Sequence, residues 1–125
     1  MQNPATPLEL STPPEEITET EILAFARDFD PQPYHLDPAA AAESIFGALC
    51  ASGWQICSFM TTRVLSAAGA AGHRFEQRAV RDLRFRKPVF PGDRLAVLAS
   101  IDAEPGGGHR ASTRGTTRNS MGGMP

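Results

Sequence analysis

Two side chains capable of proton transfer, Asp30 and His35, stand five positions apart in a segment interrupted by two prolines. Pro31 and Pro33 stiffen the backbone and exclude a regular helix across this segment. Histidine titrates near neutral pH, and a nearby carboxylate can orient its ring and raise its basicity. The spacing is therefore consistent with an acid/base pair held on a rigid loop. The alternative is that Asp30 caps a turn and His35 is a partly buried loop residue.

Two other chemistries have weaker support. Asp37 could join Asp30 and His35 around a divalent ion, but it is better placed as a helix cap, and no further ligand is near in sequence. We therefore expect no metal. Ser52 is not surrounded by the elbow motif of a serine nucleophile, and it could equally be the ordinary cap of the helix that follows.

Helix-forming sequence lies on both sides of the loop. Thr18 and Glu21 have the spacing of a capping box, which predicts a helix over residues 19–28 that ends before Pro31. A second, short helix is expected over residues 39–44. We expect the first helix to bury its apolar positions, Ile22, Phe25, Ala26 and Phe29.

A longer helix is predicted over residues 53–68, and it is small or apolar on most of its sides. The second half of the chain changes period and predicts strands over residues 79–86, 94–101 and 109–118. The expected fold class is therefore α+β, with an antiparallel sheet curled around one buried helix. Three strands are too few to cover such a helix, so further strands come from a partner chain or the domain is incomplete.

Composition narrows the class of protein. The chain has 125 residues and a formal net charge of -2, which predicts one domain with no basic footprint for nucleic acid or an anionic membrane. No apolar run is long enough to span a bilayer, and no signal peptide is evident, so we expect a cytoplasmic protein. Cys50 and Cys57 stand two helical turns apart, too far for a disulfide, and are expected to fill core space. Residues 1–16 are expected to be a flexible lead-in with a short extended piece at Leu8–Leu10.

The segment Asp30-x-Gln32-Pro33-x-His35-x-Asp37-Pro38 resembles the hydratase motif of MaoC-like hot-dog proteins, the (R)-specific enoyl-CoA hydratases and dehydratases. That family usually has Asn where Gln32 stands. Residues 24–29, 45–47, 51–54 and 87–93 are similar to the same family in order and spacing. The resemblance implies a hot-dog fold over residues 17–118. The sequence departs from the family at both ends. The strand that relatives carry before the first helix is weak or absent here, and relatives continue with strands that close the sheet, whereas residues 119–125 form an irregular tail.

By this resemblance, Asp30 and His35 hold a water molecule and add it across the double bond of a 2-enoyl-CoA thioester. The backbone N–H of Gly53 would stabilise the enolate-like thioester oxygen, and Ser58 and Gln32 would support the pair. No cofactor is implied, since CoA is part of the substrate. The partner would be a second copy or another hot-dog chain. Candidates for binding the CoA phosphates are Arg84, Arg86 and Arg94.

Two other functions stay open for a hot-dog chain. It could be a truncated, non-catalytic module that binds acyl-CoA or a partner subunit. It could also be an acyl-CoA thioesterase, because one fold hosts several activities.

Overall fold

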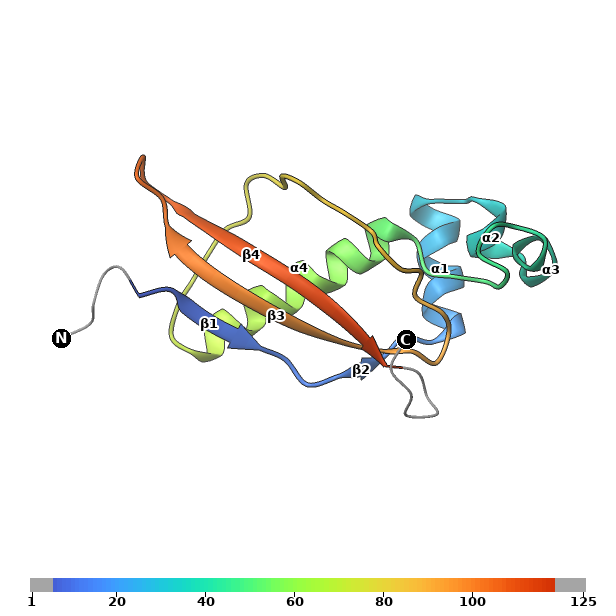
Figure 1. Cartoon of the computed structure of the whole chain (residues 1–125), viewed down its shortest axis with the longest axis horizontal. Coiled ribbons are helices and arrows are strands. Elements are labelled where there is room, and N and C mark those ends of the chain that lie inside the picture. The colour runs from blue at the N-terminus through green and yellow to red at the C-terminus, as the bar shows by residue number, and fades with distance from the viewer. Residues whose placement is uncertain (1–5, 119–125) are drawn as a thin grey trace.

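One long helix lies across a small antiparallel sheet, and three short helices gather where that helix begins (Figure 1). The computed structural model describes residues 6–118. The expected irregular tail, residues 119–125, lies outside the described residues, as do residues 1–5 of the expected lead-in. The elements in chain order are β1 (Leu8–Ser11), β2 (Glu15–Glu16), α1 (Glu19–Phe29), α2 (Pro33–Leu36), α3 (Pro38–Ala42), α4 (Gly53–Ala70), β3 (Arg94–Ala103) and β4 (His109–Arg118).

Strand β3 is the centre of the sheet. Its buried residues alternate with exposed ones, so that Leu95, Val97, Ala99 and Ile101 lie on the buried face. Strand β4 pairs antiparallel with β3 over its whole length. The strands predicted over residues 94–101 and 109–118 are therefore confirmed, and β3 extends two residues further.

The expectation of a flexible lead-in needs correction, because residues before position 17 form part of the sheet. Strands β1 and β2 both pair with β3 on the edge opposite β4. Between them, the N–H of Thr12 donates to the carbonyl of Val97 over 2.9 Å, and the Thr12 hydroxyl accepts from the N–H of Val97 over 3.0 Å. The extended piece expected at Leu8–Leu10 lies within β1, so the N-terminal strand expected to be weak or absent is present. Strand β2 has two residues, too few to show a period in the sequence.

The strand predicted over residues 79–86 is wrong. Within the described residues both edges of β3 are already occupied, by β1 and β2 on one side and by β4 on the other, so this segment has no place beside β3. Its apolar side chains are left exposed, with Val80 at 50% and Phe85 at 54%. Asp82 also has a positive φ of 54°, which interrupts an extended backbone. Alternation alone does not make a strand without a hydrogen-bonding neighbour.

Helix α1 begins at the predicted capping box. The Thr18 hydroxyl accepts from the N–H of Glu21 over 3.1 Å, and the Glu21 carboxylate accepts from the N–H of Thr18 over 3.0 Å. Ile22 and Ala26 are fully buried as expected. Phe29 is 71% exposed, contrary to prediction, because it lies in the last turn, where its ring packs against Phe25 of the same helix.

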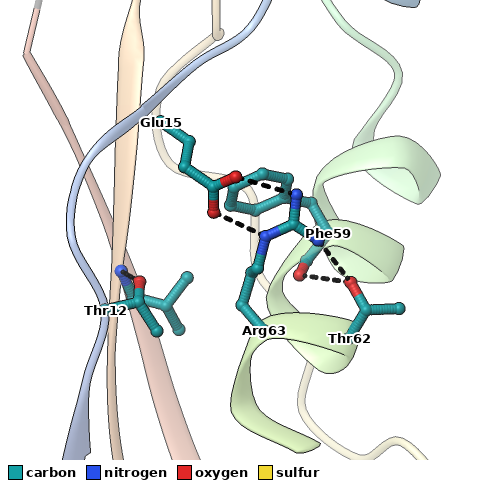
Figure 2. Close-up of polar contacts among 6 residues, drawn as sticks. Thr12, Glu15, Phe59, Thr62 and Arg63 are labelled. Carbon is teal, nitrogen blue, oxygen red and sulfur yellow. Dashed lines mark hydrogen bonds and ion pairs between the residues drawn. The ribbon is translucent and has the colours of Figure 1, made fainter. Parts of the chain in front are cut away.

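Strand β2 is also tied to α4 by side chains (Figure 2). Arg63 on α4 donates to both carboxylate oxygens of Glu15, with an Nη2–Oε1 distance of 3.0 Å. Its guanidinium lies 4.3 Å from the centroid of the Phe59 ring. The hydrogen bond that Arg63 donates to Glu15 is the main cause that raises the pKa of Arg63. The helix and the first edge of the sheet are therefore held together by a bidentate pair.

The core has two parts. One lies between β3 and the middle of α4, around Val64 and Val97. The other lies beneath the start of α4 and includes Ile22, Ile56 and Leu95. Among the described helices, none is both long and apolar enough to cross a membrane. The second cluster supports the loops that carry the candidate site.

Candidate active site

The loop that carries Asp30 and His35 is built from the ends of two helices. Asp30 caps the C-terminus of α1, and its N–H donates to the carbonyl of Ala26 over 3.0 Å. We predicted no regular helix across the two prolines, but Pro33 is the first residue of the one-turn helix α2. Proline is tolerated there because a first-turn N–H has no intrahelical partner. This turn places His35 inside the protein, where only 6% of the residue is exposed.

The two candidate catalytic side chains face each other. His35 Nε2 lies 3.5 Å from Asp30 Oδ2, and the Asp30 side chain keeps 21% of its surface exposed. On the other side of the ring, His35 Nδ1 lies 2.7 Å from the main-chain carbonyl of Cys50. A carbonyl only accepts, which assigns a proton to Nδ1. In the neutral ring, Nε2 therefore presents a lone pair to a carboxylate oxygen. Two facing acceptors need a shared proton, or a water that donates to both.

Ser52 is the third member of this group, and we did not predict it there. Its hydroxyl donates to Asp30 Oδ2 over 2.7 Å and accepts from the N–H of Trp54 over 3.2 Å. The residue is fully buried. Its role as the N-cap of α4 agrees with one of the alternatives expected from its place before that helix. Its contact with Asp30 joins residues 22 positions apart, and no local pattern indicates it.

Gly53 follows directly and is the first residue of α4. Its N–H therefore has no partner within the helix and lies at the positive end of the helix dipole. A Cβ atom here would come within 2.5–2.8 Å of three carbon atoms of the Phe85 ring. The glycine thus allows the ring to approach the backbone at the start of α4.

The supporting residues expected from the resemblance lie further out. Ser58 is exposed on α4, and within residues 6–118 no hydrogen bond joins it to His35. Gln32 is exposed and is the N-cap residue of α2, but its side chain makes no capping bond. Ser52, rather than Ser58, is the serine that contacts the pair.

The three arginines proposed for CoA are all exposed. Arg84 forms a surface ion pair with Asp82 at 2.9 Å. In the part of the chain that the structure describes, no hydrogen bond or ion pair links Arg84, Arg86 or Arg94 to Asp30 or His35. The structure therefore does not bring them into contact with the pair.

Cys50 lies beside His35, but its thiol is not in a reactive state. Its Sγ is 3.9 Å from His35 Nδ1, and the residue is only 2% exposed. Burial raises the pKa of the Cys50 thiol, which keeps it protonated near neutral pH. Cys57 is half-buried, and both cysteines are free thiols. Within the described residues, no three His, Cys, Asp or Glu side chains are grouped so that they could hold a metal ion.

Known proteins resemble this chain in both sequence and structure. The family described as "MaoC like domain" matches residues 2–121. The chain belongs to the MaoC-like family. The solved MaoC-like dehydratase from Rhodospirillum rubrum is similar over 96% of this chain and 85% of its own, with 27% identity and a TM-score of 0.71. The R-hydratase PhaJ1 from Pseudomonas aeruginosa, solved without ligand, is similar over 95% of this chain and 74% of its own, with 27% identity and a TM-score of 0.64.

Protein MaoC of Klebsiella aerogenes is 38% identical over 94 residues, which cover 70% of this chain and 26% of that protein. The chain spans less than two thirds of the length of the curated relatives that it resembles. The solved MaoC-like neighbours confirm the hot-dog fold, with the long helix α4 against an antiparallel sheet.

Proposed function

We propose that this MaoC-like chain hydrates 2-enoyl-CoA thioesters, or dehydrates 3-hydroxyacyl-CoA in the reverse direction. The observation that carries the proposal is the pair of facing acceptors, Asp30 Oδ2 and His35 Nε2, at 3.5 Å. A water molecule that donates one hydrogen bond to each would be held and oriented between them. The similarity to a solved R-hydratase and to a MaoC-like dehydratase supports the same reaction class.

The proposed reaction moves one water across one double bond. One member of the Asp30/His35 pair takes a proton from the water, and the water oxygen forms a bond to Cβ. The electrons of the C=C bond move toward the thioester oxygen, which becomes enolate-like. Cα then takes a proton from the pair, so that the product contains every atom of the water. His35 can serve in this exchange because Cys50 fixes the Nδ1 proton and leaves Nε2 free to change protonation.

The thioester oxygen needs a donor while it carries negative charge. The N–H of Gly53 is suited to this, because it has no partner within α4 and directly follows Ser52, which contacts Asp30. The chain's own residues thus supply a base, an acid and a donor. CoA enters as part of the substrate, and the exposed residues Arg84, Arg86 and Arg94 are our candidates for its phosphates.

The test is the loss of enoyl-thioester absorbance when crotonyl-CoA and longer 2-enoyl-CoAs are mixed with the protein. We expect Asp30→Asn and His35→Ala each to lower kcat by about 10²-fold or more, the usual contribution of general acid–base catalysis. Asp37→Asn is the matched control, because Asp37 lies in the same loop but is exposed and only caps α3.

Three outcomes contradict the proposal. Turnover that survives both Asp30→Asn and His35→Ala would exclude this pair from the chemistry. Binding of acyl-CoA without turnover would favour a non-catalytic module. Release of free thiol from a saturated acyl-CoA would instead identify a thioesterase.

A further inference from the structure

The buried hydroxyl of Ser52 connects the start of α4 to the Asp30/His35 pair. Its oxygen accepts the Trp54 N–H at 3.2 Å, which is the capping bond of α4. A serine hydroxyl carries only one proton, and the residue is fully buried, so that proton needs an acceptor inside the protein. The acceptor is Asp30 Oδ2, at 2.7 Å. The direction of both hydrogen bonds is therefore determined.

This arrangement does more than cap a helix. Capping uses only the acceptor function of the hydroxyl, and an N-cap serine on a protein surface would give its proton to water. Here the proton is directed at the same carboxylate oxygen that faces His35 Nε2. The bond therefore opposes rotation of the Asp30 carboxylate away from the imidazole.

We infer that Ser52 is a positioning residue for catalysis, which orients the Asp30 carboxylate and fixes its place relative to the N–H of Gly53. Both relationships pass through one hydroxyl, because Ser52 holds Asp30 and also caps the helix whose first residue is Gly53. Misplacement of a reacting group by 1 Å can lower a rate by about 10²-fold. This inference rests on the proposed hydratase function.

Ser52→Gly separates positioning from capping. Glycine is tolerated at N-cap positions, so α4 keeps its start, but the donor to Asp30 is lost. We expect kcat on 2-enoyl-CoA to fall by about 10²-fold while KM stays within about twofold. Thr18→Gly is the matched control, because Thr18 caps α1 with the same kind of hydroxyl bond and lies outside the site. Wild-type kcat in Ser52→Gly, or an equal loss in Thr18→Gly, would overturn the inference.

A second measurement does not depend on turnover. If the wild-type protein fails to hydrate any enoyl-CoA, the proposed function is wrong. The hydrogen bond between Ser52 and Asp30 can still be tested by urea unfolding of Ser52→Gly, Asp30→Ala and the double variant. We expect the double variant to lose clearly less stability than the two single losses together, because both changes remove one bond. Additive losses would overturn the proposed link between Ser52 and Asp30 whether or not the protein is an enzyme.

Discussion

His35 Nδ1 donates to the main-chain carbonyl of Cys50 over 2.7 Å, and this one bond sets the direction of the imidazole ring. The acceptor is in the segment just before α4, so the orientation of a loop histidine depends on a residue 15 positions away. The thiol of the same cysteine lies 3.9 Å from Nδ1, yet burial keeps it apart from the chemistry.

Cys50 should therefore react more slowly with iodoacetamide than Cys57 does. The reactive form is the thiolate, and burial raises the pKa of the Cys50 thiol, whereas Cys57 is half-buried. The pKa of the Cys50 thiol is higher in the folded than in the unfolded protein. The free energy of unfolding should therefore be highest below the unfolded pKa and fall as pH rises through the folded pKa. Mass spectrometry of alkylated peptides measures both rates, and urea-unfolded protein, in which the rates should converge, is the control. Faster labelling of Cys50 in the folded protein would contradict the burial of its side chain.

Alanine at Gly53 and alanine at Gly69 should have opposite effects, although both glycines lie in α4. A Cβ at Gly53 meets the Phe85 ring at 2.5–2.8 Å, whereas a Cβ at Gly69 meets nothing within 4 Å. We expect Gly69→Ala to stabilise the protein by about 0.5–1 kcal/mol, and Gly53→Ala to destabilise it by about 1 kcal/mol.

Urea unfolding gives both values. Adding Phe85→Ala should remove most of the cost of Gly53→Ala, because the ring is then absent. A cost that persists without the ring would mean that the helix start itself cannot accept alanine.

Gln32→Asn should raise stability slightly and leave activity unchanged. Gln32 is the N-cap residue of α2 but makes no side-chain capping bond, and Asn has the shorter side chain preferred at that position. We expect a gain of up to about 1 kcal/mol. Thermal unfolding measures the gain, and the enoyl-CoA assay measures activity. A large change in kcat would show that the exposed Gln32 affects the chemistry after all.

Removing the pair between Arg63 and Glu15 should weaken the attachment of β2 to α4. The two side chains are 37% and 40% exposed, so solvent screens the pair and the expected loss for Arg63→Ala is about 1 kcal/mol. Part of that loss comes from the contact with Phe59, and this part should persist at 1 M NaCl. Arg78→Ala is the control, because its pair with Glu76 is almost fully exposed. Equal losses for the two variants would mean that the Arg63 pair does not support the sheet edge.

Local signals allowed the helix starts to be predicted, because capping uses residues three or fewer positions apart. Thr18 and Asp37 cap their helices as expected, and β3 shows its buried alternation directly in the sequence. The strand at residues 79–86 could not be excluded in this way. It alternates as β3 does, but strand formation depends on a neighbour that is distant in sequence.

In the candidate site, too, local patterns could be recognised in the sequence and long-range contacts could not. Spacing alone left Asp30 and His35 open between an acid/base pair and two structural residues, and the resemblance to the hydratase motif favoured the pair. The structure brings the two side chains to 3.5 Å. The bonds that orient them, from Ser52 and to Cys50, cross 22 and 15 positions and depend on how α4 packs against the loop. Long-range contacts of this kind leave no pattern in a single sequence.

The outer edge of β4 should influence how readily molecules of this protein associate in solution. Within residues 6–118 no strand pairs with that edge, and Arg110 and Arg114 stand along it. Two molecules that met through this edge would bring these like charges together, so repulsion should oppose pairing through β4 in dilute buffer. Added salt screens that repulsion, and light scattering should therefore rise between 20 mM and 500 mM NaCl, about a fivefold shortening of the Debye length. Arg114→Thr should shift the onset to lower salt, and the solubility of this protein would then depend on the charge of a single strand.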